Sequence, residues 1–92
     1  MSSQEAVEAP RFATYSLPDS FWPHGYDPGK LKIEAALEMA MGWLIEHGHR
    51  AEVIPDDDLY LMGGMCVVVR DPATGVLSTG ADPRRECYAA AW

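Results

Sequence analysis

One run of residues in the second half of this chain restricts most strongly what it can fold into. Met65 to Val69 is continuous, apolar and rich in β-branched residues, a pattern typical of a strand covered on both faces. The turn chemistry of Asp71 to Gly75 follows and leads into Val76–Thr79, which predicts a β-hairpin. Because such a hairpin has two apolar faces, it needs a layer of structure on each side.

A single amphipathic helix is available to cover one of these faces. Residues from about 35 to 47 carry apolar side chains at three- and four-residue spacings, namely Leu37, Ala40, Met41, Leu44 and Ile45. Gly48 suits the left-handed position that ends a helix. Gly42 costs up to about 1 kcal/mol relative to alanine, which predicts that another backbone comes close to it. The second face of the hairpin needs a further layer.

Shorter elements are predicted before and after this helix. Ser3–Ala9 is a helix candidate that Ser3 can cap and that Pro10 ends. Strands are predicted at Arg11–Leu17, Leu31–Glu34 and Ala51–Ile54. Pro18–Gly29 is predicted to be an ordered loop whose three aromatic rings pack against a surface. The order of these elements predicts an α+β fold, a small antiparallel or mixed sheet with one main amphipathic helix.

Length and charge limit the classes of partner. The 92 residues fit a single domain, 1–92, and a chain this short buries only about 60% of its unfolded surface, so we expect a partner or self-association. A net charge of −7 repels phosphate backbones and anionic lipids, so neither nucleic acid nor a membrane is an expected partner. No apolar run approaches the roughly 20 residues of a membrane span and no signal peptide is recognisable, which predicts the cytoplasm.

Residues with catalytic or metal-binding chemistry lack the spacings that such sites require. Asp56–Asp58 is predicted to be a turn or loop and lacks the alternation of a calcium loop, and His47 and His49 flank a helix end without a third ligand. His24 has no nucleophile at a diagnostic spacing, and Ser2 is a nucleophile candidate only after removal of Met1. We therefore predict no catalytic, metal-binding or cofactor-binding residue.

The two cysteines are interpreted as ordinary thiols, because they are twenty-one residues apart in sequence and lack the close spacing of a zinc or redox motif. Cys66 lies in the apolar run and is predicted to be a small buried hydrophobe. Cys87 follows Arg84, Arg85 and Glu86, where nearby cations would favour its thiolate, but an ordinary thiol is the preferred interpretation here too.

Five short segments, in order, resemble the C-terminal half of a γ-glutamyltransferase small subunit. They are Ala9-Pro10-Arg11-Phe12 after a helix end, the Leu31–Glu34 strand, the helix closing with Gly48-His49, the Gly64–Arg70 strand, and Gly80-Ala81-Asp82-Pro83-Arg84. The resemblance runs from about Glu5 to Arg84. It implies part of an N-terminal nucleophile hydrolase fold, a four-layer αββα sandwich in which self-cleavage exposes a catalytic threonine.

The resemblance implies which part of the family's fold this chain corresponds to, and it implies no activity for the chain itself. The family's threonine, its glutamyl-binding residues and its paired oxyanion glycines lie upstream of every matched segment, so no catalytic residue is carried over. The motif residues Pro10, Arg11, Phe12, Asp82, Pro83 and Arg84 are expected to be structural, with charge-assisted hydrogen bonds from Asp82 and Arg84 ordering the chain end. The Pro18–Gly29 loop is longer than the family's usual link, which suggests an outlying branch.

Two hypotheses follow. In the first, the chain is a non-catalytic part of a γ-glutamyltransferase-like enzyme, inactive alone, and a larger chain carries the rest of the fold. In the second, it is an independent binding or structural module that closes its apolar face by self-association.

Overall fold

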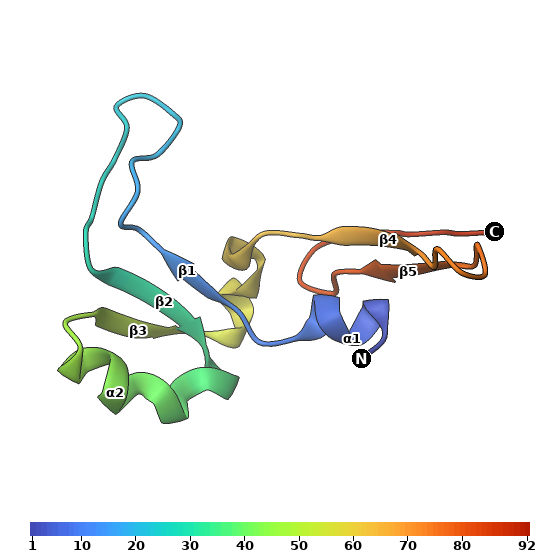
Figure 1. Cartoon of the computed structure of the whole chain (residues 1–92). Helices are drawn as coiled ribbons and strands as arrows, with labels where there is room; N and C mark the ends of the chain where they lie inside the picture. The colour runs from blue at the N-terminus through green and yellow to red at the C-terminus, as the bar shows by residue number, and fades with distance from the viewer. The chain divides into compact units, whose positions relative to one another are not determined.

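The computed structural model describes residues 1–92, and the chain divides into two compact units (Figure 1). Unit 1 comprises Met1–Ala9 and Tyr60–Trp92, and unit 2 comprises Pro10–Leu59. Each unit contains both helix and strand, so the predicted α+β class is confirmed. A single domain spanning 1–92 stays a prediction.

Unit 2 contains a three-stranded mixed sheet with the strand order β1-β2-β3. Its strands are β1 (Phe12–Thr14), β2 (Lys30–Glu34) and β3 (Arg50–Ile54). β1 pairs antiparallel with β2, with Phe12 opposite Ile33, and β3 pairs parallel with β2, with Val53 opposite Ile33. The three strands predicted in this region are confirmed, with shorter bounds at β1.

The connection between the two parallel strands is helical, as a parallel pair requires a crossover. It consists of a 3-10 helix, η1 (Ala35–Ala40), followed by α2 (Met41–Glu46). The predicted helix is therefore in place, but its first half is wound more tightly, and no side chain caps its start. Gly48 has a φ of +90° and ends the helix as predicted. The close backbone predicted at Gly42 is absent, since nothing lies within 4 Å of where a Cβ would stand.

The core of unit 2 is small. Leu31, Ile33 and Ile54 are buried on the sheet, whereas no residue of η1 or α2 is buried. The Pro18–Gly29 segment is irregular, as predicted, but its rings are not packed: Phe21, Trp22 and Tyr26 are 77%, 86% and 60% exposed. The surface that these rings were expected to contact is therefore not provided by this unit.

Unit 1 contains α1 (Ser3–Glu8) and an antiparallel hairpin of β4 (Cys66–Arg70) and β5 (Leu77–Ala81). The predicted hairpin is confirmed, and its turn includes Gly75 at a φ of +75°. α1 begins at Ser3 as predicted and ends one residue sooner, but its cap lies one residue earlier, because the Ser2 hydroxyl, and not that of Ser3, accepts the Glu5 N–H at 3.1 Å. The Glu5 carboxylate accepts the Ser2 N–H in return, which completes a capping box.

The hairpin is largely uncovered. α1 contacts β5 and β4 and buries Val7, but of the Met65–Val69 run only Val67 is even half-buried. The prediction of a strand covered on both faces is therefore wrong within this chain, because unit 1 has a single short helix. The tail after Asp82 has no helix or strand, and its Tyr88 and Trp92 side chains are exposed.

Asp56–Asp58, predicted as a turn or loop, opens a second 3-10 helix, η2 (Asp56–Met62). None of the helices is long and apolar enough to cross a bilayer.

Candidate functional site

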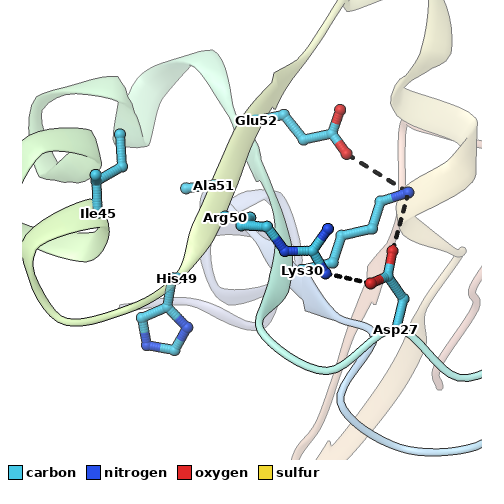
Figure 2. A pocket seen from close by; sticks show the side chains of 7 residues that line it. All are labelled: Asp27, Lys30, Ile45, His49, Arg50, Ala51 and Glu52. Atoms are coloured by element: carbon cyan, nitrogen blue, oxygen red, sulfur yellow. Dashed lines mark hydrogen bonds and ion pairs between the residues drawn. The ribbon is translucent and has the colours of Figure 1, made fainter.

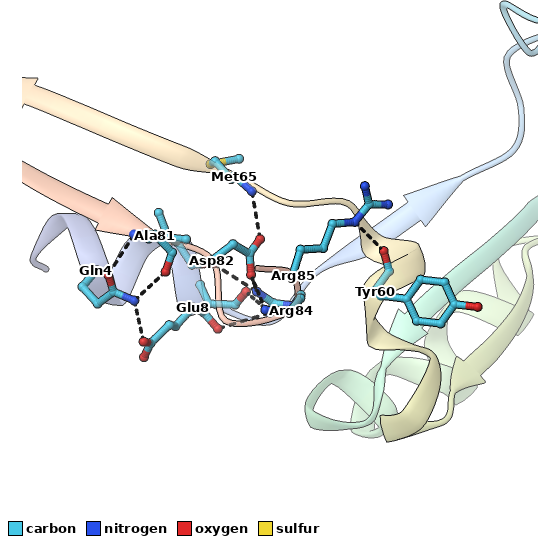
Figure 3. Close-up of polar contacts among 10 residues, drawn as sticks. Gln4, Glu8, Tyr60, Met65, Ala81, Asp82, Arg84 and Arg85 are labelled. Carbon is cyan, nitrogen blue, oxygen red and sulfur yellow. Dashed lines mark hydrogen bonds and ion pairs between the residues drawn. The ribbon is translucent and has the colours of Figure 1, made fainter. Parts of the chain in front are cut away.

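A buried carboxylate and a guanidinium join two distant parts of the sequence within unit 1 (Figure 3). The side chains of Asp82 and Arg84 are 0% and 6% exposed, and Arg84 Nη1 lies 3.2 Å from Asp82 Oδ1. The carboxylate also accepts the backbone N–H of Arg84 at 3.0 Å and that of Met65 at 3.1 Å. The ion pair and the hydrogen bonds offset the cost of removing both charges from water.

The same guanidinium caps the C-terminal end of α1. Arg84 Nη1 donates to the carbonyl of Val7 at 3.1 Å, and Nη2 donates to those of Glu8, at 3.3 Å, and Ala9, at 3.0 Å. Carbonyls at a helix end have no intrahelical partner and carry partial negative charge, so a cation is favoured there. One arginine therefore closes the helix and holds the end of the hairpin against it.

The other end of α1 lies directly on β5. The Gln4 side-chain amide pairs with the backbone of Ala81, donating to its carbonyl at 2.9 Å and accepting its N–H at 3.0 Å (Figure 3). Gly80 makes this approach possible, because a Cβ there would stand 2.6 Å from the Ser3 carbonyl oxygen. The glycine is thus required by backbone contact and not by its own φ.

The six motif residues singled out in the sequence fall into two groups. Asp82 and Arg84 form the buried cluster, with Pro83 exposed between them. Pro10, Arg11 and Phe12 belong to unit 2, where the Arg11 carbonyl accepts the Glu34 N–H at 3.1 Å and Phe12 is 65% exposed. The contact of Arg84 with three helix carbonyls was not predicted, because nothing in the sequence places residue 84 beside residues 7–9.

Unit 2 has an apolar groove between its sheet and the η1–α2 connection. The groove has a volume of about 340 Å³ and is lined by Phe12, Leu31, Ile33, Leu37, Ala40, Leu44 and His49. All but His49 are apolar, and no carboxylate or nucleophile lines it. Such a lining suits an apolar side chain rather than a reacting group.

A second hollow in unit 2 carries charged side chains (Figure 2). Asp27 accepts from Arg50 and also pairs with Lys30 at 4.0 Å, and Lys30 pairs with Glu52 at 3.6 Å. All four side chains are about a third or more exposed, so each pair contributes roughly 0–1 kcal/mol. The cluster pairs its own charges and so ties β2 and β3 to the preceding loop.

The histidines and Ser2 are not assembled for catalysis. His24 Nδ1 lies 2.8 Å from the Asp19 carbonyl oxygen, and His47 stacks on Trp43 with ring centroids 3.9 Å apart. The Ser2 hydroxyl and backbone N–H are both used in the cap of α1. No group of three or more His, Cys, Asp or Glu side chains is placed to hold a metal ion.

The two cysteines lie in different settings, and that of Cys66 is not the one predicted. Cys66 is exposed rather than buried, because β4 lacks a covering layer. Burial, and after it the neighbouring Cys66 thiol, raise the pKa of the Cys87 thiol, which argues against the alternative in which nearby arginines favour its thiolate. Those arginines are engaged elsewhere: Arg84 holds α1, and Arg85 Nε donates to the Tyr60 carbonyl at 2.9 Å.

Comparison with known proteins found likenesses among solved structures only. No protein-family model matches the chain, and no curated protein matches it. It is similar to two solved structures of LmbA2991, at 36% and 38% identity with TM-scores of 0.67 and 0.70. Each match covers 86% of this chain and 13% of the other. It is also similar to cephalosporin acylase from Bacillus halodurans, at 28% identity and a TM-score of 0.73.

The acylase match covers 100% of this chain and 15% of the other. The chain therefore spans about an eighth to a seventh of the length of the solved structures that it matches. The likeness supports a fold of the N-terminal nucleophile hydrolase type, and it does not single out the γ-glutamyltransferases within that type.

Proposed function

We propose that this chain is the non-catalytic closing part of a γ-glutamyltransferase-like or acylase-like amidohydrolase, and that it is inactive alone. One observation carries the proposal: between 86% and 100% of the chain matches a small share of much longer chains, one of them an acylase. The ordered γ-glutamyltransferase motifs add the finer assignment. In this proposal a larger chain supplies the catalytic threonine, and the complex works in the cytoplasm without a cofactor.

The distribution of apolar surface supports a larger partner. Four hydrophobic residues are buried, Val7, Leu31, Ile33 and Ile54, whereas Val68, Val69 and Phe12 are between 48% and 65% exposed. At about 25 cal/mol per Å² of apolar area, covering these side chains is strongly favourable. A chain that carries the remaining layers of the sandwich would cover them.

The test is reconstitution of activity. The chain alone should hydrolyse neither a γ-glutamyl anilide nor a cephalosporin side-chain amide, because it has no assembled nucleophile. Co-expression with a larger chain encoded beside it should give hydrolysis of one of the two amides. Hydrolysis by the chain alone that is lost in Ser2→Ala or His24→Ala would overturn the proposal.

The exposed apolar faces also favour a second candidate, an independent module that covers them with a copy of itself. Light scattering separates the two. Val68→Asp should dissociate a homodimer formed through the hairpin, whereas Val68→Thr, which keeps the shape, should leave most of it intact. A wild-type chain that is monomeric at all concentrations would remove this candidate.

A further inference from the structure

The two cysteines, far apart in sequence, are neighbours in unit 1. Cys66 begins β4, and Cys87 lies in the tail that follows Asp82. The Cys66 thiol lies 3.8 Å from the carbonyl oxygen of Tyr88, the residue after Cys87. The Cys87 sulfur in turn lies beside Gly64, two residues before Cys66, where an added Cβ would stand 3.3 Å from it. Each sulfur thus lies within contact distance of the other's segment.

Two further contacts fix the tail in this position. The Asp82 N–H donates to the Met65 carbonyl at 3.0 Å, and the Asp82 carboxylate accepts the Met65 N–H. Gly64 admits the tail, since a Cβ there would stand 3.0 Å from Arg85 Cδ and 3.3 Å from Cys87 Sγ. Asp82 therefore anchors the start of the tail, and the bare backbone of Gly64 lets Cys87 approach β4.

From this geometry we propose that Cys66 and Cys87 form a reversible dithiol–disulfide site that fastens the C-terminal tail to β4. The oxidant is a low-molecular-weight disulfide. Cys66, the more exposed thiol, reacts first as its thiolate, forming a mixed disulfide and releasing one small thiol. Cys87 then loses its proton to solvent and attacks the Cys66 sulfur, which releases the second small thiol. The two protein thiols are oxidised and the small disulfide is reduced to two thiols.

The order of attack follows from exposure and acidity. Burial, and after it the neighbouring Cys66 thiol, raise the pKa of Cys87, so only a small fraction of Cys87 is thiolate at neutral pH. It has only to resolve a disulfide formed beside it, and proximity compensates for a small thiolate fraction. The experiment uses the chain without a partner, so its outcome does not depend on whether the proposed function is correct.

The experiment equilibrates the full chain with oxidised and reduced glutathione, quenches with acid and measures intact mass and cross-linked peptides. The wild type should lose about 2 Da, the mass of the two hydrogens removed, through a 66–87 link. Cys66→Ser and Cys87→Ser should stop at one glutathione adduct each. The equilibrium constant for the link should be at least roughly tenfold larger in buffer than in urea, because folding holds the thiols together.

The result that overturns the proposal is equally definite. A wild-type chain that accumulates two glutathione adducts or intermolecular dimers without the 66–87 link has no such site. Equal equilibrium constants in buffer and in urea contradict it as well. Gly64→Val serves as a second probe, because it displaces Cys87 while keeping both thiols, and it should lower the constant measured in buffer.

Discussion

At the scale of single residues, two positions in unit 1 hold α1 against the β4–β5 hairpin. Arg84 donates to three helix carbonyls and to Asp82, and Gly80 leaves room for the backbone of α1. The contacts of Arg84 and Gly80 with α1 could not be predicted from the sequence, because they join residues more than seventy positions apart. The glycine that composition did single out, Gly42, lies in open space.

Removing the Arg84 side chain should destabilise unit 1 severely. Arg84→Ala leaves the buried Asp82 carboxylate without its cation and uncaps α1, with an expected loss of about 3 kcal/mol in the free energy of unfolding. Arg84→Lys should recover only part of this free energy of unfolding, because the point charge of an ammonium group cannot reach all of the acceptors that the guanidinium contacts. The adjacent Arg85→Ala is the control and should cost less than about 1 kcal/mol. Urea denaturation followed by circular dichroism measures all three, and equal losses at both positions would contradict this role.

A methyl group at Gly80 should separate α1 from β5. Gly80→Ala brings a Cβ within 2.6 Å of backbone, which must move, so we expect a loss of about 1–3 kcal/mol in the free energy of unfolding. Gly42→Ala, which meets nothing, should be neutral or stabilising by up to about 1 kcal/mol. Amide hydrogen exchange should show that the protection lost in Gly80→Ala is confined to residues 3–8 and 77–81. Unchanged protection there would show that the contact does not hold the helix.

At the scale of elements, type and order followed from local chemistry. Period-two alternation identified β2, turn residues identified the β4–β5 hairpin, and three- and four-residue spacing identified the helix before β3. Two features did not follow. The 3-10 winding of η1 and the exposure of β4 depend on which residues pack against them. A run of valines predicts a buried strand in either case, whether the layer that buries it belongs to this chain or to another.

The hairpin turn should lose stability in acid. The Asp71 carboxylate accepts the N–H groups of Ala73, at 2.8 Å, and Thr74, at 3.4 Å. The hydrogen bond from Ala73, and after it those from Thr74, hold the pKa of Asp71 below its usual 3.8. A lowered folded-state pKa contributes stability that is present above the unfolded value and lost as pH falls through the folded one.

Carboxyl-carbon NMR should therefore find Asp71 titrating below 3.8 in the folded chain. Asp71→Asn keeps the oxygen acceptor and removes the titration, so its hairpin amide protection should change less than that of the wild type between about pH 5 and pH 2. If the two respond equally, other carboxyl groups account for the acid sensitivity.

At the scale of the whole molecule, the chain has more apolar surface than its own elements cover. The groove of unit 2 and the hairpin of unit 1 both present apolar side chains, and the exposed rings of the Pro18–Gly29 loop add to them. The sequence indicated this imbalance through one helix and a hairpin with two apolar faces. It could not indicate which residues would be left uncovered, because that depends on packing between distant segments.

Purification of the tagged chain from its source organism tests this account most directly, with mass, stoichiometry and amidase activity read from the same fraction. We predict a one-to-one complex with a larger chain that has a threonine at a processed N-terminus and hydrolyses an amide. Val68→Asp should abolish the complex, and the isosteric Val68→Thr should preserve it. Recovery of a stable free monomer that binds no apolar dye would contradict the account.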